Sequence, residues 1–479
     1  MSKPKNPPRW VGRKGRPVLG VTMIVKNEAE RLPALFADLA DVADEVVVVD
    51  TGSTDGTRAI CQAWGVTLIR DAWRDDFSRA RNRAIQAATA RYVLWLDGDD
   101  RLPAETREGL KRLRDTELAT SDVAYLLHVI NLDASGAHGD AFLQPRIVPN
   151  RPGVRFERPV HEQIAPSLAA LGIRSVEVDL VIEHVGYATP EEMARKAQRN
   201  EALLRRAIAE NGPDVHLLVH LAQALLWLGR TKEAEAAIGD ALAQLGDGNG
   251  ELAAQLHAFR GELRSRLGNA LGAKLSFRAA LEAWPEWGVP LVPLARIALA
   301  ENEPDIALEH LEAARTRSIV AGLIAFPIRR IRSDIEFLTG IALRSRDRQA
   351  DIVPYFEAAL RIDPMHLEAR IELGQALLDR GEYAEARRVL EPAGSDPAAV
   401  ARFVDVSVAI GVARALSGDL AGGEACLAPI VDLFAEALGH PTDVDPMQLA
   451  EALLRGGYPR AALNLVNLAQ RLMTAGTAG

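Results

Sequence analysis

The first third of the chain alternates short apolar runs with amphipathic stretches. Val18–Val25 and Glu45–Val49 are apolar runs, and the second contains four consecutive valines. Continuous runs of this kind predict strands that are covered on both faces of a sheet. Val66–Arg70 and Tyr92–Leu96 predict two further strands, with helices between the strands. Because strands alternate with helices, we expect a parallel sheet with right-handed crossovers.

In the second part of the chain the pattern changes to amphipathic helices that are rich in Ala and Leu. Thr189 and Glu192 form a capping-box pattern around Pro190, which is typical of the start of a helix. The change of pattern divides the chain into three expected parts: a basic, disordered arm at 1–16, an α/β domain at 17–188 and helical repeats at 189–475.

Small residues recur with a fixed period in the helical part. Gly340 and Gly374 lie 34 residues apart, and Phe356 and Leu390 follow them at matching positions. The same template fits an earlier stretch at Gly261, Gly268, Ala273, Phe277, Ala280 and Pro285. This period, with small residues where two helices touch, resembles tetratricopeptide repeats and implies an all-α solenoid of about six or seven units. Such repeats suit a peptide or protein partner, and self-association into a homo-oligomer fits them equally well.

Composition narrows the classes of function. The chain of 479 residues is 48% hydrophobic and 25% charged, which is typical of a soluble protein with more than one domain. A net charge of −9 argues against nucleic acid as the main partner, because phosphate binding requires clustered positive charge. Cys61 and Cys426 are the only cysteines, which excludes a disulfide framework. The sequence has neither a signal-peptide pattern nor an apolar run of transmembrane length, so we expect a cytoplasmic protein.

Polar residues gather where the predicted strands end. Lys26–Glu28, Asp50–Asp55 and Asp97–Asp100 each follow a strand. Ligands of parallel α/β sheets bind at these carboxyl ends. Asp97 and Asp99 supply hard oxygen ligands that suit Mn²⁺ or Mg²⁺ bridging a diphosphate. An Asp-rich turn is also an ordinary way to leave a strand and cap the next helix, so this motif alone leaves both interpretations open.

Four ordered motifs of the α/β part resemble family 2 glycosyltransferases with the GT-A fold. More narrowly, they look like the bacterial branch that carries tetratricopeptide repeats behind the catalytic domain. The motifs are Val21–Glu28, Val49–Thr57, Asp75–Asn82 and Leu96–Asp99, and the stretches Arg151–Ile164 and His184–Tyr187 resemble the same branch. One departure is Gly98, where this branch more often has alanine. A change between two small residues is expected to leave metal binding intact.

The resemblance implies a donor site for a nucleotide sugar, which is usually linked to UDP. Asp50 would contact the base or ribose, Glu28 would line the same pocket, and Arg81 would lie near the base or the diphosphate. The residues expected at the donor are Asn27, Glu28, Asp50, Ser53, Asp55, Arg81 and Asp97. In the alternative, Asp50 and Asp55 only cap turns, and Arg81 pairs with Asp76 on a helix surface.

The expected metal shell combines two motifs that are distant in the sequence. The resemblance implies that Asp97 and Asp99 hold the metal and the ribose. His184 follows an alternating stretch at 176–183 that predicts a last strand. This histidine is expected either to complete the metal shell or to be a satisfied core histidine.

Transfer also requires a group that accepts a proton from the acceptor as the acceptor attacks the anomeric carbon. The resemblance implies inversion at that carbon and an acidic base that follows the metal motif. Glu162 is the expected base, and Asp100 and the neighbouring His161 are the other catalytic candidates. In the alternative, His161 and Glu162 form a structural salt bridge.

The expected function is therefore that of an inverting, metal-dependent glycosyltransferase. It would move a UDP-linked hexose to a protein, peptide or glycan acceptor, with the repeats as the place where an acceptor is held. The competing hypothesis is a catalytically inactive, nucleotide-binding scaffold for protein–protein interaction. A sugar nucleotidyltransferase ranks lower, because Lys26–Glu30 contains no glycine-rich loop after the first strand.

Overall fold

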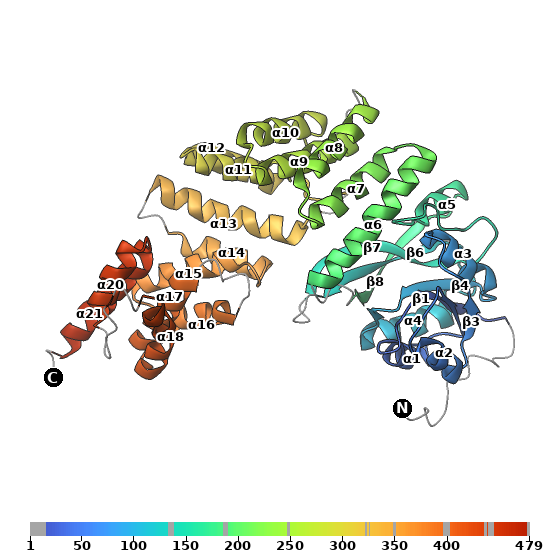
Figure 1. Ribbon diagram of the computed structural model, residues 1–479, viewed down its shortest axis with the longest axis horizontal. Coiled ribbons are helices and arrows are strands. Elements are labelled where there is room, and N and C mark those ends of the chain that lie inside the picture. The colour runs from blue at the N-terminus through green and yellow to red at the C-terminus, as the bar shows by residue number, and fades with distance from the viewer. Residues whose placement is uncertain are drawn as a thin grey trace. The chain divides into compact units, whose positions relative to one another are not determined.

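The computed structural model describes residues 16–132, 138–184, 190–246, 250–320, 323–324, 326–347, 351–395, 403–434, 438 and 445–476. Residues 1–15 of the expected basic arm, the helix cap at Thr189 and the motif residues 185–187 lie outside this part. The chain divides into two units, Met1–Asp247 and Gly248–Gly479 (Figure 1). None of the described helices is long and apolar enough to cross a membrane.

Four parallel strands form one half of the sheet in the first unit, in the order β3-β2-β1-β4. All four strands were predicted from their apolar runs. Their bounds are β1 (Leu19–Val25), β2 (Glu45–Asp50), β3 (Thr67–Arg70) and β4 (Tyr92–Asp97). The helices that connect them are α1 (Leu32–Leu39), α2 (Thr57–Trp64) and α3 (Phe77–Ala87).

The other half of the sheet is mixed, so the expectation of a purely parallel sheet is wrong there. β7 is antiparallel to β4 and β6, whereas β6 and β8 are parallel. Only residues 133–137 separate β6 from β7, which is too short for the crossover that a parallel pair requires. The elements of this half are β5 (Asp100–Arg101), α4 (Ala104–Thr116), β6 (Ala124–Leu132), β7 (His138–Pro149), α5 (Ala165–Ala170) and β8 (Ser175–His184).

The four valines of β2 are buried on both faces of the sheet, as predicted. Val46 and Val48 belong to the core that β2 shares with α1, α2 and α4. Val47 and Val49 pack on the other side, against Ala80 of α3. Because α3 is fixed to this face by apolar contacts, its polar side chains are held beside the carboxyl ends of the strands.

The elements that follow β8 in the described part of the chain are helices, and the expected class of an α/β domain followed by an all-α array is confirmed. The first unit ends with α6 (Pro190–Asn211), α7 (Val215–Trp227) and α8 (Thr231–Leu245). The second unit contains α9 (Glu251–Arg266), α10 (Ala270–Ala283), α11 (Leu291–Ala300), α12 (Pro304–Thr316), α13 (Ile328–Arg346), α14 (Val353–Ile362), α15 (Leu367–Arg380), α16 (Tyr383–Leu390), α17 (Phe403–Leu416), α18 (Leu420–Leu433), α20 (Pro446–Arg455) and α21 (Pro459–Gly476).

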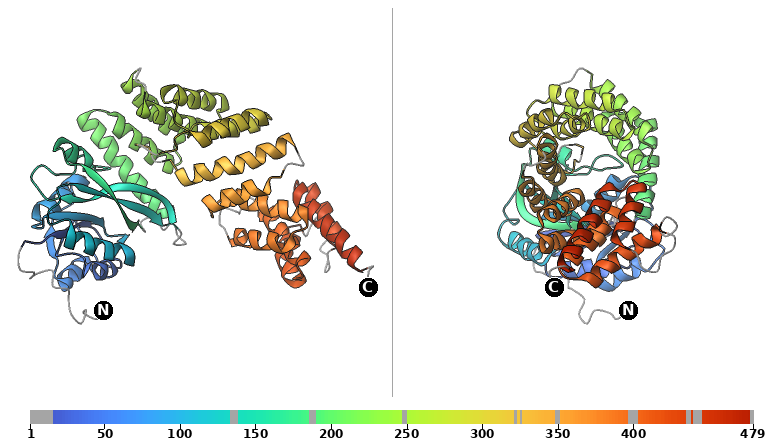
Figure 2. Two further views of the ribbon diagram at one scale, coloured as in Figure 1. Left: turned by 180° about the vertical axis from the view of Figure 1, so that it is seen from behind. Right: turned by 90° about the vertical axis from the view of Figure 1, so that its left-hand side faces the viewer.

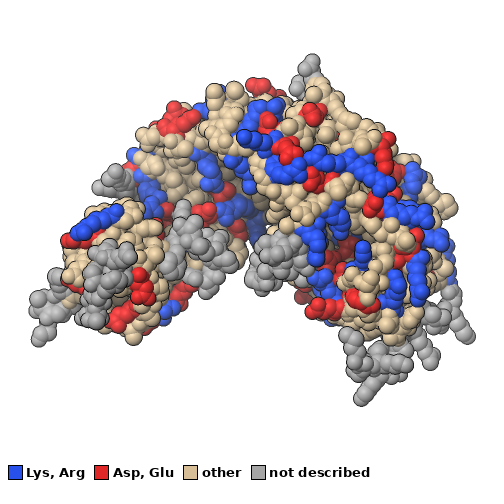
Figure 3. Space-filling model, in the orientation of Figure 1, with Lys and Arg blue, Asp and Glu red and all other residues tan. Residues whose placement is uncertain are grey.

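Consecutive helices of this array pack as pairs, which Figure 2 shows for the second unit. Among the described residues there are seven pairs, from α7 with α8 to α20 with α21. On the surface of the first unit, acidic and basic side chains lie side by side (Figure 3). Ion pairs such as Arg230–Glu201 and Arg205–Glu233 join its helices there. Solvent weakens exposed ion pairs of this kind, so the apolar contacts between paired helices provide most of the stability.

The periodic glycines lie where the two helices of a pair touch. A methyl group at Gly374 would come within 2.3 Å of Leu390 in the partner helix, and one at Gly340 within 2.7 Å of Phe356. The same arrangement recurs at Gly261. The period in the sequence therefore reflects a repeated close approach of two helices, at which only glycine leaves room for the bulky partner side chain.

Replacing Gly374 with alanine should overpack this contact and destabilise the protein by about 1–3 kcal/mol. We expect a lower temperature of thermal unfolding, measured by circular dichroism on the full chain. Gly56→Ala is the matched control, because a methyl group there meets only Ala29, at an ordinary contact distance of 3.5 Å. Equal stability of the two variants would contradict the close helix contact.

Candidate active site

The loops after β1 and β2 are joined by reciprocal hydrogen bonds. The backbone N–H of Asn27 donates to Oγ of Ser53 at 2.9 Å, and the N–H of Thr54 donates to Oδ1 of Asn27 at 2.8 Å. The N–H of Ala29 donates to Oδ2 of Asp55 at 3.1 Å. Asn27 has a φ angle of 60°, a left-handed conformation that asparagine tolerates better than most residues. Asn27, Ser53 and Asp55, which were predicted at the nucleotide sugar, therefore lie together in two joined loops.

Asp50 is buried at the end of β2. Its Oδ1 accepts a hydrogen bond from the N–H of Ser53 at 2.9 Å, and its Oδ2 pairs with Arg58. Burial alone would raise the pKa of Asp50, but the hydrogen bonds from Ser53 and Arg58 lower it below its usual value. Asp50 thus caps its turn, as the alternative interpretation requires, and Asp55 does the same through the N–H of Thr57. Contact of either carboxylate with a nucleotide stays a prediction.

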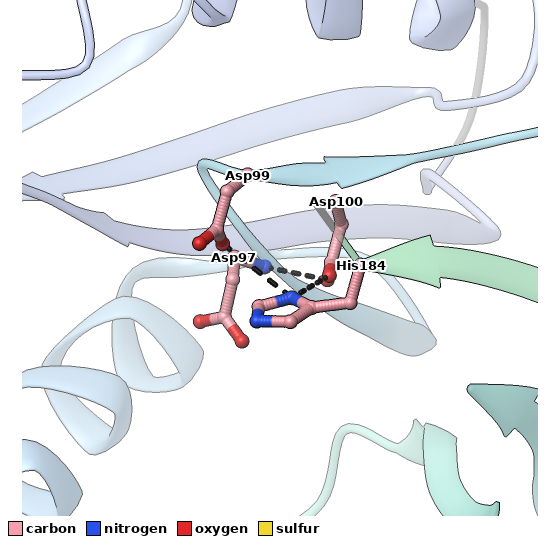
Figure 4. Close-up of side chains that lie close together, drawn as sticks. All are labelled: Asp97, Asp99, Asp100 and His184. Carbon is pink, nitrogen blue, oxygen red and sulfur yellow. Dashed lines mark hydrogen bonds and ion pairs between the residues drawn. The ribbon is translucent and has the colours of Figure 1, made fainter. Parts of the chain in front are cut away.

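Three carboxylates and one imidazole gather at the other side of β1. Asp97 ends β4, Asp99 lies in the following turn, Asp100 begins β5, and His184 ends β8. Each of these side chains offers one ligand atom, and the four atoms lie within 4.8 Å of one another. Figure 4 shows the four side chains together. Antiparallel pairing of β5 with β8, in which Asp100 faces His184, brings together residues that are far apart in the sequence.

Asp100 makes hydrogen bonds to two other members of this cluster. Its Oδ2 accepts hydrogen bonds from the backbone N–H of Asp97 at 2.8 Å and from Nη1 of Arg146 at 2.9 Å. Its Oδ1 shares a hydrogen bond of 2.8 Å with Nδ1 of His184. The side chain of Asp100 has no exposed surface, so an acceptor cannot reach it in this conformation. The geometry therefore disfavours Asp100 as the base, and the role stays a prediction.

Electrostatic interactions within the cluster push the pKa values of its members in opposite directions. Burial raises the pKa of Asp99; His184 lowers it, and the charges of Asp97 and Asp100 raise it further, so the net shift is upward. Burial would lower the pKa of His184, but the hydrogen bond to Asp100 and the surrounding carboxylates raise it. Burial would raise the pKa of Asp97, but the guanidinium groups of Arg81 and Arg146 hold it well below its usual range.

Arg81 extends from α3 and connects the cluster to Glu162. Its Nη2 lies 2.7 Å from Oδ1 of Asp97, and its Nε lies 2.6 Å from Oε1 of Glu162. The guanidinium group is buried and lies 4.5 Å from the centre of the Trp95 ring. The alternative in which Arg81 pairs with Asp76 on a helix surface is wrong, because Asp76 instead caps α3. Among the described residues, Nη1 of Arg81 is buried without a hydrogen-bond partner.

His161 and Glu162 point to different partners. Glu162 pairs with Arg81, so the alternative of a salt bridge between His161 and Glu162 has the wrong partner. The imidazole of His161 stacks on His220 of α7, with ring centres 3.8 Å apart. Burial, with the nearby His216 and Arg199, lowers the pKa of His161 to about 4. His161 is therefore neutral near pH 7, and it lies in a contact between the sheet and the first paired helices.

Comparisons with known families agree with this geometry. The model for glycosyl transferase family 2 matches residues 21–126, and a tetratricopeptide repeat model matches residues 348–402. The N-terminal part of this chain is thus similar to the family 2 glycosyltransferases. The matched stretch contains both joined loops, Arg81 and all three carboxylates of the cluster.

Relatives of known name match slightly less than half of this chain. A TPR repeat-containing protein of Synechococcus elongatus is 34% identical over 45% of this chain and 54% of its own length. The glycosyltransferase SunS of Bacillus subtilis is 27% identical over 45% of this chain and 53% of its own length. This chain thus spans about half the length of these relatives. The crystal structure of S. aureus TarS 1-349 has a TM-score of 0.32 and 16% identity, with coverage of 55% and 91%.

Three polar residues near the site of the glycosyltransferase domain were not predicted. Nζ of Lys196, on α6, lies 3.6 Å from Oδ2 of Asp99. Arg146 extends from β7, a strand that the sequence pattern did not indicate. Asn82 belongs to a motif of the family resemblance, and its amide makes hydrogen bonds of 2.8 and 2.7 Å with the backbone of Phe156. Only Asn82 had a signal in the sequence, because it directly follows Arg81 in that motif.

Gly98 allows Glu28 to lie close to the carboxylate cluster. A methyl group at Gly98 would come within 2.8 Å of Cγ of Glu28. Burial and the charge of Asp99 raise the pKa of Glu28, and Arg31 partly offsets this shift. Glycine at position 98, where the related branch more often has alanine, therefore leaves the space that the side chain of Glu28 occupies.

Gly98→Ala should destabilise the domain by about 1–3 kcal/mol, the usual effect of overpacking, because the Glu28 side chain has to move. We expect the urea concentration at half-unfolding to fall. In the Glu28→Ala background the same change should have little effect, since the obstructing side chain is absent. A cost that is equal in both backgrounds would mean that Glu28 does not occupy the space beside Gly98.

Proposed function

We propose that this chain is an inverting, metal-dependent glycosyltransferase that moves a hexose from a UDP-linked donor to a protein, peptide or glycan acceptor. One observation carries the proposal. The cluster of Asp97, Asp99 and His184 is connected through Arg81 to Glu162, so candidate metal ligands and a candidate base lie in one site. The family 2 match and the relatives named as glycosyltransferases support the reaction class.

The side chains of the cluster are ligands that fit a divalent cation. Asp97, Asp99 and His184 would hold it with carboxylate oxygens and one imidazole, which are ligands that Mn²⁺ and Mg²⁺ accept. When bound, the cation supplies a Lewis acid that offsets the negative charge developing on the leaving diphosphate. The unpartnered Nη1 of Arg81 offers a buried hydrogen-bond donor to the same anionic group.

Glu162 would act on the acceptor. Its carboxylate accepts the proton of the attacking group while that group bonds to the anomeric carbon and the bond to the diphosphate oxygen breaks. The hydrogen bond from Nε of Arg81 leaves the other carboxylate oxygen of Glu162 to take this proton. Attack from the face opposite the leaving group inverts the anomeric centre.

An acceptor with an extended shape fits the paired helices, because stacked repeats present long surfaces that can bind peptides. The tetratricopeptide match at 348–402 lies within these helices.

A nucleotide-binding scaffold without activity is the competing function. The two are separated by incubating the protein with Mn²⁺ and a panel of UDP-sugars and measuring released UDP. No turnover on the whole panel, together with UDP binding, would favour the scaffold.

The metal assignment predicts that Asp99→Asn abolishes turnover, because the cluster loses one of its anionic ligands. Binding of Mn²⁺, measured by calorimetry, should weaken in parallel, while thermal unfolding without metal stays close to that of the wild type. Asp122→Asn is the matched control, since Asp122 pairs with Arg151 at the surface. Full turnover in Asp99→Asn, or in protein treated with EDTA, would refute the metal assignment.

The base assignment predicts that Glu162→Gln binds UDP and Mn²⁺ normally but transfers sugar about 10²–10⁴-fold more slowly. The amide oxygen of glutamine still accepts the hydrogen bond from Arg81, and Asp97 still pairs with the charge of Arg81, so the contact between the loop and α3 is kept. Glu157→Gln, which changes a more exposed carboxylate paired with Arg155, is the control.

The two possible failures of this prediction have different meanings. Wild-type transfer rates in Glu162→Gln would move the base role to His161 or Asp100. Loss of UDP binding in Glu162→Gln would instead make Glu162 a donor-site residue, and the mechanism would need another base.

A further inference from the structure

Glu162 lies in a short loop that is closed by its own backbone. The N–H of Glu157 donates to the carbonyl of Gln163 at 2.9 Å, and the N–H of Gln163 donates back at 3.0 Å. Within the closed loop, Arg158 has a φ angle of 76° and His161 one of 52°. Residues other than glycine rarely adopt these left-handed conformations, and they persist only where surrounding contacts hold them. The loop therefore requires support from outside.

That support comes from α7, at both strained positions. Nη1 of Arg158 lies 2.9 Å from Oδ2 of Asp214, the residue that caps the start of α7. The ring of His161 stacks on His220 at 3.8 Å, with an angle of 7° between the ring planes. Each left-handed residue of the loop thus has its own contact with the same helix.

The next residues along the chain extend this contact. Nε2 of Gln163 and Nε2 of His216 lie 3.0 Å apart, and the ring of His216 packs edge-on against His220. Burial lowers the pKa of His220 to about 3 and that of His216 to about 4, so the rings stack as neutral groups near pH 7. Among the described residues, Nε2 of His220 is buried without a partner, which fits a role in packing rather than hydrogen bonding at that atom.

The opposite side of the loop is held by α3. The N–H of Phe77 donates to the carbonyl of Pro159 at 2.8 Å, and Arg81 pairs with Glu162. The amide of Asn82 bonds to the backbone of Phe156, directly before the loop. The loop is therefore clamped between a helix of the sheet domain and the first helix of the repeat pairs.

We propose that α7 is a positioning element of the transferase, and that His220 and Asp214 hold the loop so that Glu162 faces Arg81. This inference rests on the proposed role of Glu162 as base. His220 and Asp214 are positioning residues, since they act through Arg158 and His161. The first paired helices then belong to the catalytic machinery, in addition to any role in binding an acceptor.

The first experiment compares His220→Ala with His220→Phe in the full chain. Alanine removes the ring that stacks on His161, whereas phenylalanine keeps a flat, somewhat larger ring and loses the hydrogen bond of Nδ1 to Gln223. We expect His220→Ala to lower kcat for UDP-sugar turnover by about ten- to a hundredfold, as misplacement of a reacting group does, without changing the Kd for UDP. His220→Phe should restore most of kcat. His310→Ala, in α12 of the second unit, is the matched control.

The second experiment keeps the helix cap and removes the ion pair. In Asp214→Asn the side chain can still accept from the N–H of Leu217, but its charge for Arg158 is lost. We expect a lower kcat than in the wild type. Adding Arg158→Gly should recover it, because glycine adopts the left-handed conformation without support. This pair of variants decides the matter even where His220→Ala fails to fold.

Hydrogen–deuterium exchange of residues 157–163 reports on the loop independently of turnover. His220→Ala and Asp214→Asn should exchange faster there, and the two rescuing variants should return to the wild-type rate. Unchanged exchange in His220→Ala and Asp214→Asn would overturn the inference, whatever the kcat. Faster exchange with unchanged kcat would overturn the catalytic role of the clamp, while the base role of Glu162 is decided separately by Glu162→Gln. Failure of His220→Phe and of Arg158→Gly to restore kcat would also overturn it.

Discussion

The buried guanidinium group of Arg81 is the interaction on which the site depends. It carries a positive charge in a place from which water is largely excluded, and such a charge is tolerated only when it is paired and hydrogen-bonded. The two carboxylates that satisfy it come from different motifs: Asp97 from the strand end and Glu162 from the loop clamped by α7. Loss of either partner would leave part of the charge uncompensated, so the two motifs cannot vary independently.

A second buried charge organises the neighbouring half of the site. Asp100 accepts from Arg146 of β7 and from the backbone of Asp97, and it shares a hydrogen bond with His184 of β8. The mixed part of the sheet thus has a chemical role as well as a structural one. Its strands β7 and β8 place Arg146 and His184 beside the turn that contains the carboxylates. Together, Arg81 and Arg146 also lie over the ring of Trp95, which fixes both guanidinium groups on one support.

The sequence predicted those features that depend on local patterns. A regular signal in the sequence marks the valines of β2, the strand ending at Asp97 and the 34-residue period. Burial on both faces of the sheet restricts the residue types of the strands, and a repeated close contact restricts those of the paired helices. The pairing of β5 with β8 leaves no such signal, since it depends on long-range register. For the same reason the partners of Arg81 were misassigned in one alternative, and the stacking of His161 on α7 was not predicted. His161 and Glu162 were recognised as a motif, but only the fold shows that they face different helices.

The change of sequence pattern and the end of the first compact unit fall at different places along the chain. The pattern changes near residue 189, whereas the first unit continues to Asp247 and includes α6, α7 and α8. The change of pattern marks where the strands end, whereas the first compact unit continues through the three helices that follow. For protein engineering, this means that a chimera with exchanged catalytic parts should be joined after α8. A junction directly after β8 would pair the loop of one parent with the α7 surface of another, and stacked rings and ion pairs would then have to match by chance.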